Sequence, residues 1–156
     1  TTVAGTVVGG SANGTGTSAS FSYPKGITTD GTNLYVADSS NHLIRKIVIS
    51  TGVVTTLAGT GSSGSANGTG TSASFNNPPG ITTDVTYLYL ADMNNHLIRK
   101  IVISTGVVTT VAGTGSIGSA NGTGTSASFE KPSGITTDGT NLYVGDYGNH
   151  LIRKIE

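Results

Sequence analysis

Short clusters of Val, Ile, Leu and Tyr recur along the chain and are separated by turns rich in Gly, Asn, Asp and Ser. In the first unit these clusters occupy residues 26–30, 34–37, 42–49 and 53–58. Runs of β-branched and aromatic residues of this length, bounded by turn formers, are typical of strands. No segment carries a helical hydrophobic period, so the pattern predicts an all-β protein whose units each contribute four antiparallel strands.

The unit returns every 54 residues, as the positions of His42, His96 and His150 show. Residues 55–102 and 109–156 are identical at 36 of 48 positions, which indicates recent duplication or deliberate engineering. A Gly/Ser/Thr-rich segment, residues 59–74, links one unit to the next and ends at Phe75, which we expect to anchor it. Repeats of this length form arrays in which each unit packs against its neighbours.

Two strings recur in all three units. Residues 38–45 read Asp-Ser-Ser-Asn-His-Leu-Ile-Arg, and residues 21–27 follow the pattern Phe-x-x-Pro-x-Gly-Ile. Both strings resemble the NHL repeat, a family named for its Asn-His-Leu. The resemblance covers nearly the whole chain and implies a β-propeller of four-stranded blades, usually six of them. On this basis we expect blade 1 at residues 21–59, blade 2 at 75–113 and blade 3 at 129–156.

The two ends of the sequence fall inside repeat units. Residues 1–5 match residues 55–59, which belong to a fourth strand, and residue 156 lies within a third strand. We therefore expect blade 3 to lack its outer strand and residues 1–5 to complete a blade of a partner chain. Open strand edges favour such pairing. The prediction is a half-propeller that homodimerises into a six-bladed ring with inter-chain strand closure. The alternative is an arbitrary truncation.

The composition limits the classes of partner that the chain is expected to bind. Eight basic and eight acidic residues give a formal net charge of zero, which disfavours a nucleic-acid partner. The absence of cysteine excludes disulfides and thiolate metal sites. No apolar run is long enough for a bilayer and no signal peptide is visible, so no membrane partner is expected and the localisation stays open.

One group of polar residues enters the third strand of every unit. The acidic residue can accept main-chain N–H groups and pair with the arginine, and catalytic centres rarely recur in equal copies. We therefore predict a structural turn network made by three equivalent sets: Asp38, His42, Arg45, Asp92, His96, Arg99, Asp146, His150 and Arg153.

A second acidic group ends the innermost strand of each unit, at Asp30, Asp84 and Asp138. Carboxylates around a central channel are weak candidates for holding a cation, and capping of the following turn is the favoured interpretation. The Asn-Gly-Thr sequences at residues 13, 67 and 121 match a glycosylation acceptor pattern, although a glycine-rich turn is favoured there too.

The units differ in three turns: before the first strand, between the second and third strands, and between the first and second strands. The first two of these turns leave the same face of an up-and-down blade, and loops on a rigid scaffold are where binding residues gather. Neutral drift of exposed turns is the alternative explanation. The candidate ligand contacts are Tyr23, Lys25, Asn77, Met93, Lys131 and Tyr147.

These observations favour a non-catalytic repeat scaffold or binding module, with itself and an unknown protein or small-molecule ligand as partners, and with no cofactor. A metal-dependent hydrolase or lyase with a central-channel site is an alternative that the family resemblance implies. Such an enzyme would need an asymmetric cluster of His and carboxylates, whereas the three histidines are equivalent. A carbohydrate-binding propeller is a further alternative, because repeated Tyr and Asn side chains suit sugars.

Overall fold

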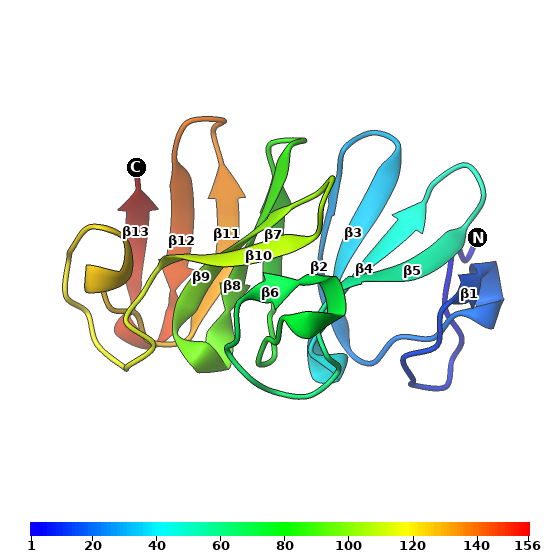
Figure 1. Cartoon of the computed structure of the whole chain (residues 1–156), viewed down its shortest axis with the longest axis horizontal. Coiled ribbons are helices and arrows are strands. Elements are labelled where there is room, and N and C mark those ends of the chain that lie inside the picture. Colours follow the sequence, from blue (N-terminus) through cyan, green and yellow to red (C-terminus); the bar gives the residue numbers. More distant parts are fainter.

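Thirteen strands form three antiparallel sheets in the computed structural model, which describes residues 1–156 (Figure 1). Blade 1 contains β1 (Gly14–Thr15), β2 (Pro24–Thr29), β3 (Asn33–Asp38), β4 (Leu43–Val48) and β5 (Val53–Ala58). Blade 2 contains β6 (Gly68–Thr69), β7 (Gly80–Thr83), β8 (Tyr87–Asp92), β9 (Leu97–Val102) and β10 (Val107–Ala112). Blade 3 contains β11 (Pro132–Thr137), β12 (Leu142–Asp146) and β13 (Leu151–Ile155). The predicted all-β class is confirmed.

Six short 3-10 turns complete the structure. They are η1 (Gly16–Ser18), η2 (Ser39–Asn41), η3 (Gly70–Ser72), η4 (Met93–Asn95), η5 (Gly124–Ser126) and η6 (Tyr147–Asn149). No helix is long and apolar enough to cross a membrane.

Each complete sheet has one strand more than the sequence predicts. The order is β1-β5-β4-β3-β2 in blade 1 and β6-β10-β9-β8-β7 in blade 2. The additional strand is a two-residue segment of the connector, which pairs with the outer strand of the blade that follows it in sequence. The connector is therefore part of the sheet rather than a free linker.

Two strand boundaries also differ from the prediction. His42 ends the η2 turn with a left-handed backbone, φ 56°, so β4 begins at Leu43 rather than at His42. The inner strand of blade 1 begins at Pro24, two residues before the predicted Gly26, whereas the inner strand of blade 2 begins at Gly80, the equivalent of Gly26.

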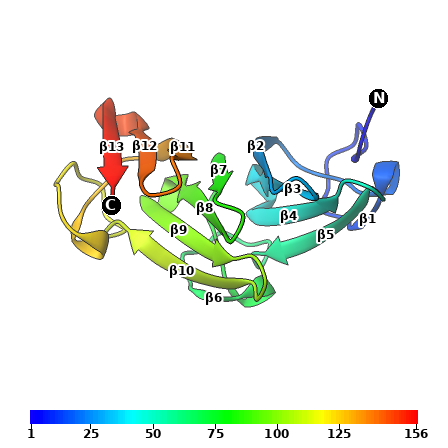
Figure 2. The same cartoon turned by 90° about the horizontal axis from the view of Figure 1, so that it is seen from above.

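The three sheets follow one another along an arc, with β2, β7 and β11 on its inner side and β5 and β10 on its outer side (Figure 2). The face that carries η2, η4 and η6, together with the segments 22–25, 76–79 and 130–133, is called the lower face here. The β2–β3, β7–β8 and β11–β12 turns form the opposite, upper face (Figure 1).

The two larger clusters of the hydrophobic core lie between neighbouring sheets, and a smaller one belongs to blade 1 alone. One cluster joins Tyr35 and Ile44 of blade 1 to Phe75 and Leu88 of blade 2. The cluster between blades 2 and 3 repeats this arrangement with Ile98 and Phe129, among others. Because most of the core lies between blades, each blade depends on a neighbouring sheet for its stability.

A glycine allows the inner strands to approach each other. A Cβ atom on Gly26 would lie 2.7 Å from the carbonyl oxygen of Pro79, and one on Gly80 would collide with the carbonyl oxygen of Ser133. The equivalent Gly134 faces open space, with nothing within 4 Å of such an atom. Its side of blade 3 has no neighbouring sheet in this chain.

Candidate functional site

A buried ion pair organises the lower end of every blade. In blade 2, Asp92 and Arg99 are both fully buried, and the Arg99 Nη1 atom donates to Asp92 Oδ2 at 2.7 Å. The other Asp92 oxygen accepts the main-chain N–H of Asn76 at 2.7 Å. The same pairing joins Arg45 to Asp38 at 2.9 Å and Arg153 to Asp146 at 2.9 Å.

The arginine also holds the connector against its blade. Arg99 Nη2 donates to the Ala66 carbonyl and to Asn67 Oδ1, both at 3.0 Å, and its guanidinium lies 5.4 Å above the centroid of the Phe75 ring. Sequence reasoning missed this role of Asn67 and its equivalents Asn13 and Asn121, because the acceptor and its arginine lie 32 residues apart. A guanidinium that donates to this many fixed acceptors is a structural anchor.

The asparagine of the Asn-His-Leu motif ties the third-strand turn to the incoming connector. Asn95 Nδ2 donates to the Gly64 carbonyl at 2.7 Å and to Asp92 Oδ2 at 2.8 Å. Asn41 and Asn149 make the equivalent bonds in their own blades.

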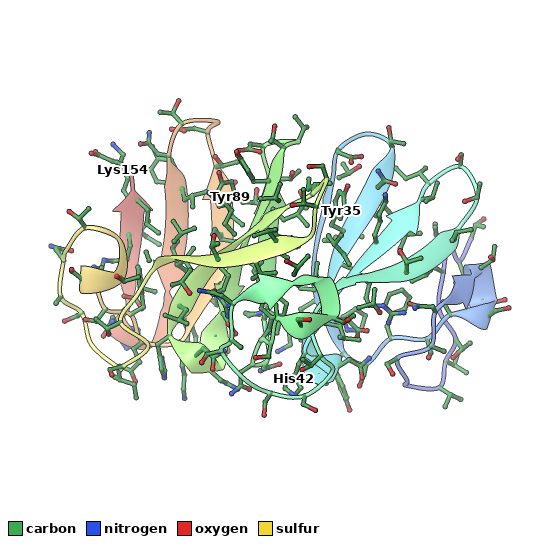
Figure 3. The ribbon with its side chains drawn as sticks, in the orientation of Figure 1. Tyr35, His42, Tyr89 and Lys154 are labelled. Carbon is green, nitrogen blue, oxygen red and sulfur yellow. The ribbon has the colours of Figure 1, made fainter.

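The histidine of the motif reaches the next blade instead of joining the Asp–Arg pair. His42 Nδ1 accepts the main-chain N–H of Asn77 at 3.0 Å, and His96 Nδ1 accepts that of Lys131 at 3.1 Å. The predicted turn network is therefore divided in two, with the carboxylate and guanidinium inside one blade and the imidazole between two. Figure 3 shows His42 at the lower edge of the molecule.

The leucine of the motif packs under the outgoing connector. Leu43 and Leu97 are buried, and their Cδ2 atoms lie close to Gly59 and Gly113. In blade 3 the equivalent Leu151 is exposed, as is His150. The three letters of the motif thus make three different contacts, and two of these contacts are missing at the last blade.

The three acidic residues at the ends of the inner strands cap their own turns. Asp138 Oδ1 accepts the N–H of Asn141 at 2.7 Å and of Thr140 at 2.9 Å, and these bonds hold the pKa of Asp138 well below its ordinary range. Asp30 and Asp84 accept the matching N–H groups. No three His, Asp or Glu side chains lie close enough together to hold a metal ion.

A tyrosine completes each of these turns. The Tyr35 hydroxyl donates to Asp30 Oδ2 at 2.8 Å, and burial together with this bond raises the pKa of Tyr35 to about 12. The pKa of Tyr89 is also raised to about 12, by burial and by the neighbouring charge of Asp84. Figure 3 shows both tyrosines on the half of the molecule opposite His42.

The predicted ligand contacts all lie on the lower face. Tyr23, Asn77 and Lys131 occupy equivalent positions and share a left-handed backbone, with φ of 47°, 54° and 52°. The Tyr23 and Tyr147 side chains are exposed, whereas Asn77 and Met93 are half-buried. Lys25 and Lys131 are exposed as well. The structure brings these residues to one face without forming an enclosed pocket among them.

A family model described as NHL repeat matches residues 21–47, which hold β2, β3 and all but the last residue of β4 in blade 1. NHL repeat-containing protein 2 of Homo sapiens is 32% identical over 154 residues, covering 88% of this chain and 21% of that protein. Protein SUPPRESSOR OF QUENCHING 1, chloroplastic, of Arabidopsis thaliana is 34% identical over 149 residues, covering 88% of this chain and 14% of that protein. The chain belongs to the NHL-repeat family. It spans about a fifth or less of the length of these relatives.

Solved structures share the fold of this chain. An auxiliary nutrient binding protein from Bacteroides ovatus is 28% identical, with a TM-score of 0.70 over 81% of this chain and 35% of that chain. A virginiamycin B lyase from Staphylococcus aureus is 22% identical, with a TM-score of 0.53 over 85% of this chain and 41% of that chain. The second likeness shows the fold alone. The β-propeller expectation is thus supported.

The outermost NHL units each leave one sheet face uncovered. On blade 1, Phe21, Ile27 and Ile47 line an open groove of about 350 Å³. On blade 3, Tyr143 and Ile152 line another of about 380 Å³. The uncovered face of blade 1 is formed by the repeat positions that, in blade 2, pack on blade 1. The uncovered face of blade 3 is formed by the repeat positions that, in blade 2, pack on blade 3.

The residues before blade 1 already hold the position of an outer strand. The Gly5 N–H donates to the Gly16 carbonyl at 3.1 Å, as Gly59 donates to Gly70 at 3.1 Å. Residues 1–5 form no strand within the chain, and β13 has no partner on its outer edge.

Proposed function

We propose that this NHL-repeat protein is a non-catalytic scaffold that associates with a second copy of itself. Blade 3 of each copy packs on blade 1 of the other, and the two arcs close into a six-bladed ring. Residues 1–5 of each copy then pair with β13 of the other. The ring is a symmetric dimer with two identical interfaces.

The observation that carries this proposal is the difference in exposure between equivalent isoleucines. Ile44 and Ile98 are fully buried between blades, whereas Ile152, their equivalent in blade 3, is 81% exposed. On the other face, Ile81 is 6% exposed and its equivalent Ile27 is 59% exposed. The two open faces are thus the two halves of an interface that the chain already forms twice.

Burial of apolar side chains supplies the driving force for this association. Covering one isoleucine side chain contributes about 1.5–3 kcal/mol. Each of the two interfaces would cover Ile27 and Ile152, together with the partly exposed Phe21, Leu34 and Tyr143. Pairing of β13 with residues 1–5 would also satisfy main-chain groups along an exposed strand edge.

Sedimentation velocity on charged variants tests this arrangement. We expect Ile27→Asp and Ile152→Asp to sediment as monomers, because each places a carboxylate in both interfaces. The matched control is Ile117→Asp, an exposed connector residue outside both faces, which should remain a dimer like the parent chain. Circular dichroism should show the same β-sheet content for all of them. A dimer that persists in both face variants would contradict the proposal.

Mixing the two face variants tests which faces meet. A ring built from one Ile27→Asp chain and one Ile152→Asp chain contains one unaltered interface and one doubly altered interface. We therefore expect the mixture to form a weak open dimer although neither variant does so alone. If blade 1 packed on blade 1 instead, the mixture would form no dimer that contains both variants. That result would contradict the proposed packing of blade 3 on blade 1.

A further inference from the structure

The imidazole links between blades are complete at two positions and open at a third. His42 and His96 each accept a main-chain N–H from the residue 35 positions later, which lies in the following blade. His150 Nδ1 has no donor within the chain, and the N–H of Tyr23 has no acceptor. These two unpaired groups are the equivalents of the acceptor and donor in the completed links.

Both open groups already have the backbone geometry of the completed links. His150 has φ 59°, against 56° and 57° for His42 and His96. Tyr23 has φ 47°, against 54° and 52° for Asn77 and Lys131. A left-handed backbone is unfavourable for a residue with a Cβ atom, and proline follows each of the three donors. The segment around Tyr23 therefore has the conformation of the completed links although no histidine accepts its N–H group.

We infer that His150 accepts a hydrogen bond at Nδ1 from the main-chain N–H of Tyr23 in a second copy of the chain. This inference rests on the proposed dimer and assigns a polar contact to each of its two interfaces. An imidazole that accepts at Nδ1 is neutral and carries its proton on Nε2. The link therefore fixes the tautomer of His150 as well as the register of the two chains.

The consequence for the motif is specific. The asparagine joins the connector to its own blade, whereas the histidine joins successive blades, so loss of the histidine should act on blade-to-blade contacts. At blade 3 the next blade belongs to another chain. His150 is then the one motif histidine whose removal changes association rather than the internal packing of the chain.

Two measurements on the full chain test this contact. With ¹⁵N-labelled histidine, long-range ¹H–¹⁵N NMR correlations distinguish the two neutral tautomers. We expect the Nε2–H form alone for all three histidines in the dimer, and we expect only His150 to become a mixture of the two neutral tautomers when dilution separates the chains. His42 and His96 act as internal references in the same spectra.

The second measurement compares the dimer dissociation constants of His150→Phe and His42→Phe. Removal of one neutral hydrogen bond at each of two interfaces should raise the dissociation constant by on the order of 30-fold for His150→Phe. His42→Phe should leave it near the parent value, because its link lies within one chain.

The outcomes separate this inference from the proposed function. A parent chain that stays monomeric at every concentration would overturn the dimer and the contact together. Two results would overturn the contact alone while the parent chain still forms a stable dimer. One is a His150 tautomer that does not change on dilution, and the other is a parent dissociation constant for both phenylalanine variants.

Discussion

At the scale of single residues, the buried Asp–Arg pair is the polar element on which each blade depends most. Arg45 and Asp38 have no exposed side-chain surface, and the arginine also holds the connector through the Ala12 carbonyl at 2.9 Å. Removing one member of a buried pair is costly because the other charge is left without its partner.

Arg45→Leu should therefore destabilise the chain by about 3–5 kcal/mol. The neighbouring Lys46→Leu is the matched control, because it removes the same number of charges from the same strand without touching a buried carboxylate, and it should cost less than about 1 kcal/mol. Urea unfolding followed by circular dichroism measures both. Equal losses for the two variants would show that the pair is not an anchor.

The capped turns predict how the tyrosines titrate. The folded-state pKa of Tyr35 is about 12, above the ordinary value of about 10, so the hydroxyl contributes stability that is complete below about pH 10 and is lost as the pH rises through about 12. Asp30→Asn removes the carboxylate charge and replaces one of its two accepting oxygens with an NH2 donor, and Tyr35 should then ionise at a lower pH. Near-ultraviolet absorbance titration measures this shift. Asp138→Asn serves as the control, since its turn contains Tyr143 instead, and an unchanged titration in Asp30→Asn would contradict the assignment.

At the scale of the elements, the packing of inner strands depends on a glycine whose surroundings differ between blades. Gly80 lies against the backbone of blade 3, whereas Gly134 faces no neighbour in the chain. Neither residue has a positive φ, so alanine is acceptable to the backbone at both positions and only the surrounding space distinguishes them.

Gly80→Ala should destabilise the chain by about 1–3 kcal/mol, because the inner strands of blades 2 and 3 must move apart. Gly134→Ala should leave the unfolding of the monomer unchanged but weaken the dimer, since blade 1 of a second copy would approach this glycine. Thermal unfolding at concentrations where the dimer is dissociated measures the stability of the monomer. The molar mass at concentrations where the dimer forms measures association. A dimer unaffected by Gly134→Ala would argue against the proposed closure.

The sequence predicts those elements whose pattern is local. The fourth strand, residues 53–58, has the predicted bounds because turn residues enclose a β-branched run. The two-residue β6 was missed because Gly68 and Thr69 carry no hydrophobic pattern and pair with a strand 38 or more residues away. Contacts such as that between His42 and Asn77 depend on how two blades meet, which no local pattern encodes.

At the scale of the whole molecule, the chain is an array with two unlike open faces. Every blade has two unlike faces. At each internal interface, one kind of face packs on the other kind of face of the next blade, and one face of each kind stays uncovered at the two ends of the array. Head-to-tail faces close into a ring if the rotation per blade allows it and otherwise form filaments. Whether the lower-face side chains Tyr23, Lys25 and Tyr147 bind a ligand stays a prediction that depends on which of these assemblies forms.

Light scattering of the unmodified chain across a dilution series tests the central claim most directly. Two chains of 15.6 kDa per particle, with no larger species at high concentration, is the result that the complementary faces predict. A folded particle of one chain at every concentration would contradict it, and so would a mass that grows without limit, because the arcs would then fail to close.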